Sequence, residues 1–498
     1  MTSTRRAPTA SRSRARTGCV TCKYRHVRCD EQRPSCSQCV RSKRRCEGYP
    51  PTASPTTALN SLVNDAERRA FLFFKTRTVY KIFGHHDAVE WLSILLHFGY
   101  TEEPIKHAIV AVASLHESIE PINKSVTLSR AQRTEAAYIM ALKHYNDAIK
   151  HLREVALTVS AKPDVTMVLC LLFTCFEQLR SGDAACFIHL MAGLRSVYSW
   201  RCNTKSYVNF SSFPRPTSDF INEKITPILQ RLRVQFALCM DQRHTSSVAG
   251  TSPCLPAPSI PNSYKTFSAA RIDYDRTMNY VFSTLDQQHT LGSTILSKEL
   301  LSTLDRWKRA LDCSKTVHGD PDFQLCTRTL LELYYHVSII VTSTLHADNE
   351  LVFDSHDDRF QQIVNLAEGI VQAWTPDSQQ YKMLFSFDLG LASPVFLVAS
   401  RCRRSSLRRR ALQIMFQSPT YRGAWRDQYS GLCAERIIHI EEQGFSRLDL
   451  DPYVPESQRI RKVSADLDEE NGCIVMQYIY SPFTADSQIF TTVIQING

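Results

Sequence analysis

Six cysteines near the start of this 498-residue chain constrain its fold more than any other feature. They are Cys19, Cys22, Cys29, Cys36, Cys39 and Cys46. Their spacing, C-x2-C-x6-C-x6-C-x2-C-x6-C, is one three-cysteine unit that occurs twice. Each unit opens with C-x2-C, which brings two thiolates to one ion across a tight turn. Its third cysteine returns after a spacer long enough for about one and a half helical turns. The pattern predicts a small metal-bound module with two short helices.

The number of cysteines predicts which metal site they form. A structural zinc ion takes four ligands in a tetrahedron, so two ions need eight ligand positions while six thiolates are present. Two cysteines must therefore bridge, and the repeat predicts that they occupy equivalent places in the two units. The alternative is one ion held by the two C-x2-C pairs, which leaves the third cysteine of each unit without a role. We therefore expect two zinc ions per chain.

The positive charge of the chain is concentrated around these cysteines. Residues 1–48 hold 13 of the 59 Lys and Arg and three of the 49 Asp and Glu, so this segment accounts for the whole net charge of +10. A polyanion, with nucleic acid as the first candidate, is the partner that such a segment favours. A solvated basic tail is the alternative, and the embedded cysteines argue against it.

The remaining composition indicates a soluble intracellular protein. Residues 1–18 lack the apolar core of a secretory signal, and a transit peptide is the weaker alternative because the stretch has no apolar face. The longest apolar run, about residues 165–176, is shorter than the ~20 residues that cross a bilayer. In a reducing compartment the cysteines are expected to be ligands or buried side chains, not disulfides.

The order of segments predicts a small cluster module followed by a large all-α domain. The expected segments are a disordered basic tail (1–17), the cysteine module (18–48), a proline-rich linker (49–64), a helical domain (65–450) and a C-terminal tail (451–498). Apolar residues at helical spacing cover 105–119, 138–152, 165–179, 225–236 and 330–345. Residues 204–219 and 245–263 are expected to be loops. Alternating residues in 473–480 and 489–496 predict a short β-hairpin in the tail.

The chain shows no motif of a known catalytic site. It contains no H-E-x-x-H, G-x-S-x-G, phosphate-binding loop or G-x-G-x-x-G, so we expect that it is not an enzyme. Residues 85–87 (HHD) are interpreted as a surface turn, and His107 and His116 as core or rim histidines. The cysteines between 170 and 186 are interpreted as packing residues, with redox or ligand sensing as the alternative. The basic run 401–410 is interpreted as a helix face, with a nuclear import signal as the alternative.

Residues 17–49, TGCVTCKYRHVRCDEQRPSCSQCVRSKRRCEGY, resemble the zinc binuclear cluster of fungal transcription factors, the Zn2Cys6 class. The six cysteines match the pattern of that family. The basic residues between the second and third cysteines also match it, as do Asp30 and Pro34. The resemblance implies that Cys19 and Cys36 are the bridging ligands. Segments 67–74, 105–118, 176–197 and 420–443 resemble, more diffusely, the helical regulatory domain that accompanies such clusters. That resemblance implies regulation, pairing or signal reception and no catalysis.

The resemblance also implies how the module reads DNA. The first helix enters the major groove at a short G/C-rich triplet, usually CGG, and the third and fourth residues after the second cysteine read it. Here these are Arg25 and His26, and His26 stands where lysine is more usual. Arginine suits a bidentate bond to guanine, whereas Lys23 and Arg28 are expected on phosphates. The basic residues of 41–45 are expected either on phosphates or in a nuclear import signal. The candidate DNA-binding residues are Lys23, Arg25, His26, Arg28, Arg41 and Lys43.

Together these observations predict a nuclear, sequence-specific DNA-binding transcription factor that regulates genes of RNA polymerase II. The expected partners are duplex DNA and the transcription machinery, with no membrane. Because residues 49–60 lack heptads, we expect either that two copies do not pair or that they pair through the helical domain. The alternatives are an RNA- or protein-binding zinc module, or a sensor that does not bind promoters.

Overall fold

The structure is a computed structural model of the whole chain. In the cysteine module it describes residues 19, 21–22, 27, 29–30, 32, 36–42 and 46. Beyond it, the described residues are 64–119, 128–156, 162–180, 183–206, 219–239, 255–291, 294–314, 321–344, 347, 349–373, 387, 389–417, 422–423, 425–443, 454–468, 471–484 and 487–496. Contacts divide the chain into two compact units, Met1–Arg68 and Arg69–Gly498. The expected basic tail and nearly all of the expected linker lie outside the described residues.

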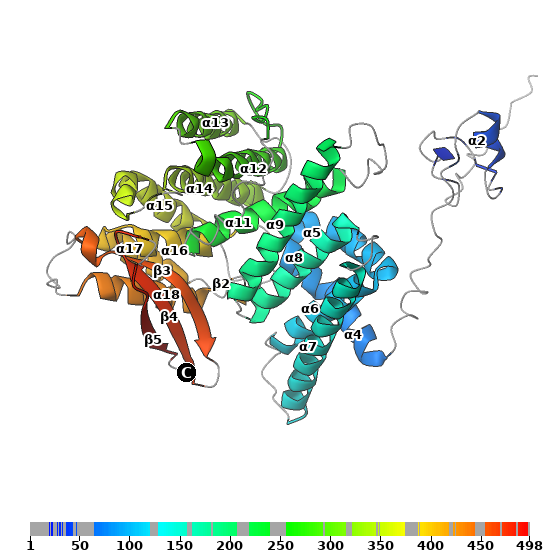
Figure 1. The fold of residues 1–498 in the computed structure, drawn as a ribbon, viewed down its shortest axis with the longest axis horizontal. Helices are drawn as coiled ribbons and strands as arrows, with labels where there is room; N and C mark the ends of the chain where they lie inside the picture. The colour runs from blue at the N-terminus through cyan, green and yellow to red at the C-terminus, as the bar shows by residue number, and fades with distance from the viewer. Residues whose placement is uncertain are drawn as a thin grey trace, which may run out of the picture. The chain divides into compact units, whose positions relative to one another are not determined.

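The first half of the large unit is helical throughout its described residues (Figure 1). Helix α4 (Asp65–Phe73) crosses the boundary between the two units at Arg68. It is followed by the π-helical turn η1 (Phe74–Thr78), α5 (Val79–Thr101), α6 (Glu103–Ile119), α7 (Leu128–Ala156), α8 (Pro163–Arg180) and α9 (Asp183–Ser206). Proline is tolerated in a first helical turn, where the N–H it lacks would have no helical acceptor, and α6 and α8 both begin this way. The helix predicted over residues 105–119 is confirmed as α6.

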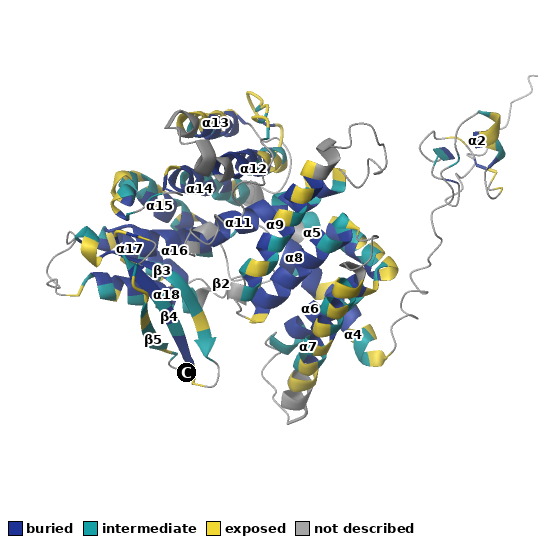
Figure 2. Ribbon diagram, viewed as in Figure 1, coloured by how far each residue is buried: buried dark blue, intermediate teal, exposed yellow. Residues whose placement is uncertain are grey.

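Helix α8 forms the centre of this half because it is apolar on nearly every side. All of its residues from Met167 to Leu179 are buried, and it contacts α6 and α9 (Figure 2). The ring of Tyr145 from α7 stacks on that of Phe176 with centroids 4.1 Å apart. Such burial on all faces is typical of a core helix, which surface-facing helices then cover.

The second half continues the helical packing. Its elements are the π-helical turn η2 (Ile221–Ile225), α11 (Thr226–Cys239), α12 (Phe267–Leu291), α13 (Thr294–Asp312), α14 (Pro321–Thr344), the 3-10 turn η4 (Leu351–His356), α15 (Asp357–Ala373), α16 (Ala392–Arg401), α17 (Ser405–Gln417) and α18 (Asp427–Glu441). Buried polar contacts join neighbouring helices. Arg231 of α11 pairs with Asp275 of α12 at 3.0 Å, and the indole N–H of Trp307 of α13 donates to a carbonyl of α12.

A three-stranded antiparallel sheet follows α18. Its order is β3 (Ile460–Asp468), β4 (Cys473–Tyr480) and β5 (Phe490–Gln495), after the short turn η6 (Glu456–Gln458). A two-residue pair, β1 (Arg422–Gly423) and β2 (Trp425–Arg426), precedes α18. The sheet contacts α18, and Arg436 of α18 donates to Thr492 of β5. The predicted β4–β5 hairpin is confirmed, and β3 is an additional strand that the sequence analysis did not predict.

Two interpretations from the sequence are wrong. Residues 85–87 lie within α5 and not in a surface turn, and Asp87 accepts a hydrogen bond from Arg271 of α12 at 2.7 Å. The basic run 401–410 is not one helix face, because α16 ends at Arg401 and α17 begins at Ser405.

No helix within the described residues is long and apolar enough to cross a membrane.

The basic run is only partly exposed, because three of its six arginines are buried. Arg401, Arg403 and Arg408 are all buried. The carboxylate of Glu350, which has no exposed surface, lies 2.9 Å from Arg401, 3.2 Å from Arg403 and 2.9 Å from Arg461 of β3. A second fully buried carboxylate, Glu441, lies 2.7 Å from Arg408. The run therefore supplies buried ion pairs that join α16 and α17 to α18 and the sheet.

Candidate metal centre and nucleic-acid interface

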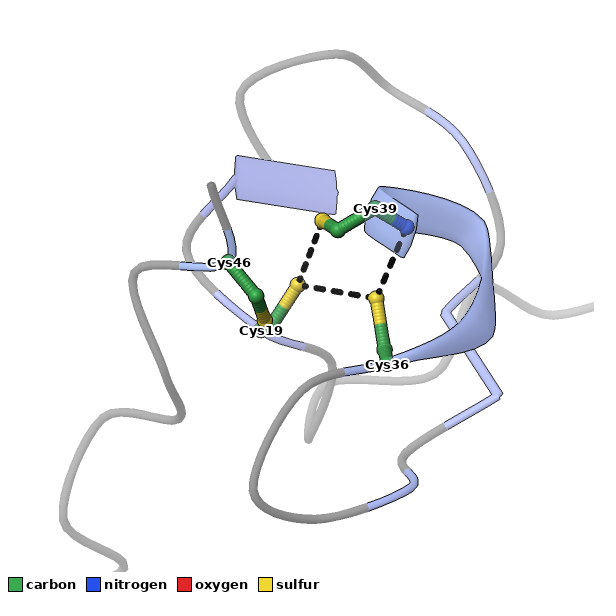
Figure 3. A group of neighbouring side chains, drawn as sticks. All are labelled: Cys19, Cys36, Cys39 and Cys46. Atoms are coloured by element: carbon green, nitrogen blue, oxygen red, sulfur yellow. Dashed lines mark hydrogen bonds between the residues drawn. The ribbon is translucent and has the colours of Figure 1, made fainter. Parts of the chain in front are cut away.

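The described part of the small unit is organised around the six cysteine sulfurs. The sulfur of Cys19 lies 3.6 Å from that of Cys36 and 3.8 Å from that of Cys39 (Figure 3). The sulfur of Cys22 lies 3.6 Å from that of Cys36 and 3.9 Å from that of Cys39. Five of the six side chains are buried and Cys46 is half-buried. The two three-cysteine repeats of the sequence therefore contact each other through their sulfur atoms.

The sulfurs form two overlapping groups of four. One group is Cys19, Cys22, Cys29 and Cys36, and the other is Cys19, Cys36, Cys39 and Cys46. Within each group, all sulfurs lie within 4.8 Å of one another. The groups share Cys19 and Cys36, which are the first cysteines of the two units.

These distances suit zinc. Four thiolates bonded to one zinc ion at about 2.3 Å in a tetrahedron lie about 3.8 Å from one another. The three separations that join sulfurs of one group, Cys19–Cys36, Cys22–Cys36 and Cys19–Cys39, are 3.6 to 3.8 Å and are close to that value. When zinc is bound it acts as a structural cross-link, and two four-sulfur groups with two shared members offer eight ligand positions from six thiols.

Backbone N–H groups support the two shared sulfurs in the same way. The N–H of Cys22 donates to the sulfur of Cys19, and the N–H of Cys39 donates to that of Cys36, both at 3.4 Å. Cys36 is also the N-cap of the short helix α2 (Ser37–Arg41). In the first unit, Thr21 and Cys22 are helical. In each three-cysteine repeat, the shared sulfur therefore lies at the start of a helical segment, where backbone N–H donors stabilise negative charge.

Burial strongly affects the acidity of these thiols. It raises the pKa of Cys19 and Cys22 above the ordinary range and raises that of Cys36 to about 12. At neutral pH such thiols lose their protons only when a cation compensates the thiolate charge. Metal binding to this unit is therefore coupled to the release of protons.

Asp30 links the two halves of the module. Both of its carboxylate oxygens accept the backbone N–H of Ser37 at 3.1 Å, and the Ser37 hydroxyl donates to Gln32 at 2.7 Å. These bonds to Ser37 lower the pKa of Asp30. The carboxylate thereby holds the segment between Cys29 and Cys36 against the start of α2.

Asp30→Ala is expected to speed the release of zinc to a competing chelator severalfold, because the start of α2 and its cysteine lose this restraint. Asp30→Asn keeps one side-chain oxygen as an acceptor and is expected to show a smaller increase. A colorimetric chelator measures the release rate from the full chain at pH 7. Equal rates for the wild type and Asp30→Ala would show that the contact has no role in retaining the metal.

The structure describes one of the six candidate DNA-binding residues. Arg41 lies in the last turn of α2 and is exposed. The others lie outside the described residues; they are Lys23, Arg25, His26, Arg28 and Lys43. Their contacts with bases and phosphates therefore stay predictions.

The cysteines of the large unit that the sequence interpreted as packing residues are buried, and of the two core or rim histidines His116 is buried and His107 is half-buried. Cys170 and Cys175 are almost fully buried, and burial raises the pKa of Cys170 to about 12. Neither has the accessible, acidic thiol that a redox sensor needs. His116 is buried beside the hydroxyl of Thr78 at 2.9 Å. His107 is different, because its ring contacts a second histidine that the sequence analysis did not select.

Two family models match the chain. The fungal Zn(2)-Cys(6) binuclear cluster domain matches residues 17–55, and the fungal specific transcription factor domain matches residues 73–221. The second match extends from α4 to η2 in the large unit. No solved structure matches the chain.

The curated relatives are transcription regulators of fungi. The aspercryptin biosynthesis cluster-specific transcription regulator atnN of Emericella nidulans is 23% identical over 411 residues, which are 73% of this chain and 65% of that protein. The transcription regulator lscL of Purpureocillium lilacinum is 21% identical over 424 residues, or 73% of this chain and 96% of the relative. The transcriptional regulatory protein moc3 of Schizosaccharomyces pombe is 42% identical over 55 residues, which are 11% of each chain.

The matches agree with the arrangement of the sulfurs and with the helical architecture of the large unit. Transcription regulators of this kind are generally not enzymes, and their family implies DNA binding and a nuclear location. The chain therefore carries one segment that matches the fungal Zn(2)-Cys(6) binuclear cluster domain and one that matches the fungal specific transcription factor domain, and the curated proteins that it resembles are fungal transcription regulators.

Proposed function

We propose that this chain is a sequence-specific transcription factor that reads short, CGG-like triplets in duplex DNA and regulates genes transcribed by RNA polymerase II. The observation that carries the proposal is the pair of four-sulfur groups that share Cys19 and Cys36. These groups lie in the one segment that holds the whole net charge of the chain. A rigid, metal-bound, cationic module is suited to a polyanionic duplex.

All six cysteines are assigned as zinc ligands, with Cys19 and Cys36 bridging the two ions. Arg25 and His26 are assigned to the base edges in the major groove. The remaining basic residues are assigned to phosphate contacts, which position the module without selecting a sequence. They are Lys23, Arg28, Arg41 and Lys43. The exposure of Arg41 at the end of α2 is compatible with such a contact.

The other parts of the chain have regulatory roles in this proposal. Residues 18–48 read DNA, and residues 65–450 form a helical domain that regulates activity, contacts the transcription machinery and pairs two copies of the chain. The large unit is assigned no catalytic role. The protein acts in the nucleus, in keeping with its family.

Arg25→Ala is expected to cost about 1–3 kcal/mol of binding free energy on a CGG-containing duplex and much less on a scrambled one. The reason is that arginine can form two hydrogen bonds with guanine, and alanine forms none. Lys23→Ala is the matched control. It is expected to weaken binding equally on both duplexes and to reduce the salt slope by about one. Fluorescence anisotropy of the full chain at several salt concentrations measures both effects.

The same titration separates the alternatives. A loss of equal size on both duplexes for Arg25→Ala contradicts the base-reading role of that residue. Tighter binding to RNA than to any duplex would favour an RNA-binding zinc module. An absence of binding to either nucleic acid by the zinc-loaded chain would favour a protein-binding module or a sensor.

A further inference from the structure

A group of histidines lies where α6 packs against α7, in the large unit and far along the chain from the cysteine cluster. The Nδ1 atom of His107 on α6 lies 2.8 Å from the Nδ1 atom of His144 on α7. Asp147 follows His144 by three residues and therefore lies on the same face of α7. One ligand atom from each of His107, His144 and Asp147 lies within 4.8 Å of the other two.

The short contact between the two imidazoles requires a particular protonation state. Two Nδ1 atoms at 2.8 Å share one proton, so one ring donates and the other must be unprotonated at that atom. His144 is 5% exposed and His107 is half-buried, which disfavours charge on either ring. Burial lowers the pKa of His107, and the nearby carboxylate of Asp147 opposes that shift only in part. Neutral imidazole is the form that binds metals.

The surroundings of the pair favour a cation over an anion. Asp147 and Glu103 are the acidic groups that act on His107, and the nearby Lys106 is paired with Glu103 at 2.6 Å. The ring of His151 stacks on that of His107 with centroids 5.3 Å apart and shields one side of the group. Two imidazoles and a carboxylate are ligands that suit Zn²⁺, Ni²⁺ and Cu²⁺ better than Ca²⁺ or Mg²⁺.

We propose that His107, His144 and Asp147 form a second metal site, which binds one divalent first-row transition-metal ion and fastens α6 to α7. The ion takes the place of the shared proton, which moves to the Nε2 atom of the same ring, so that each imidazole keeps one proton. Ligand atoms about 2.0–2.1 Å from a tetrahedral ion lie about 3.3–3.4 Å apart, so the imidazole nitrogens need to separate by roughly half an ångström. The carboxylate of Asp147 provides the third ligand, and a water molecule completes the tetrahedron.

Zinc titration of the full chain tests this proposal. The protein is first loaded with two zinc ions at the cysteine cluster, and a further equivalent is added in the calorimeter. The wild type is expected to bind one additional ion, which appears as a third binding event. His107→Gln and His144→Gln are expected to abolish this third binding event. Asp147→Asn is expected to weaken it by more than about tenfold, the loss typical of removing only an outer-shell partner.

His439→Gln is the matched control, because His439 is an exposed histidine on α18. It is expected to bind the third ion as the wild type does. Cobalt(II) distinguishes the two sites, since thiolate ligands produce an intense charge-transfer band and imidazole and carboxylate ligands do not. The proposal is overturned if the wild type binds only two zinc ions, or if His107→Gln and Asp147→Asn bind the third as tightly as the wild type. If circular dichroism shows that the more buried His144→Gln does not fold, His107→Gln and Asp147→Asn still test the proposal.

Discussion

Cys36→Ala is expected to leave the chain without either zinc ion, whereas Cys46→Ala is expected to leave one ion in place. The sulfur of Cys36 belongs to both four-sulfur groups, and the sulfur of Cys46 belongs to only one. Loss of a shared sulfur therefore removes one ligand from each ion. Loss of an unshared one leaves the group of Cys19, Cys22, Cys29 and Cys36 intact. Zinc per folded chain, measured by elemental analysis after gel filtration, distinguishes the two outcomes.

The loss of both ions should also abolish DNA binding. Apparent binding energies of structural zinc in small zinc modules are about 10–16 kcal/mol at neutral pH, so the metal supplies most of the folding energy of such a unit. Cys19→Ala is expected to match Cys36→Ala because the two residues occupy equivalent places in the repeat. Cys313→Ala, at an exposed cysteine of the large unit, is the control and should retain both ions. Equal zinc losses in Cys36→Ala and Cys46→Ala would contradict the bridging assignment.

The metal centre could be anticipated from sequence because its chemistry is local. Six thiols within a short segment, together with the four-ligand rule for zinc, lead to two ions and two bridging residues. The supporting backbone geometry was not accessible in this way. The bond from the N–H of Ser37 to Asp30 depends on how the intervening loop folds back, and the spacing of these two residues does not encode that path.

Periodicity predicted the helices well where one face of a helix is buried. The apolar stripe in α6 agrees with its observed span, Glu103–Ile119. Strand β3 was missed because its charged sequence, IRKVSADLD, lacks a continuous alternation of apolar residues. The turn that joins β3 to β4 does carry a signal. Asn471-Gly472 is a typical hairpin pair, and Gly472 has a φ of 60°, a conformation that glycine adopts without steric cost.

Contacts between distant segments could not be read from the sequence. The basic run 401–410 resembles a surface feature by composition, yet its buried members pair with Glu350 and Glu441, and Glu350 lies about fifty residues before the run. Likewise, His107 could be placed on a helix face, but its partner His144 lies on another helix. Such pairs depend on how helices pack, and local patterns do not determine packing partners.

Glu350→Gln is expected to lower the free energy of unfolding of the large unit by about 3–5 kcal/mol, the usual cost of removing one partner from a buried ion pair. The Glu350 carboxylate accepts hydrogen bonds from Arg401 and Arg461 through one oxygen, and from Arg403 through the other. A neutral amide leaves these three buried guanidinium groups without their shared countercharge. Urea unfolding of the full chain, followed by far-ultraviolet circular dichroism, measures the loss.

Glu90→Gln is the matched control, because Glu90 pairs with Lys224 at 2.7 Å on the surface of the same unit, where the pair is worth less than about 1 kcal/mol. The effect of pH provides a second check. Burial raises the pKa of Glu350, but Arg401, Arg461 and Arg403 outweigh burial and hold that pKa below its ordinary value. The stability due to this carboxylate is therefore fully present above the unfolded pKa of about 4.3 and is lost as pH falls through the lower folded pKa. The difference in the free energy of unfolding between the wild type and Glu350→Gln should consequently become smaller as the pH falls. A difference that stays constant from pH 7 to pH 3 would show that the variant acts through packing and not through charge.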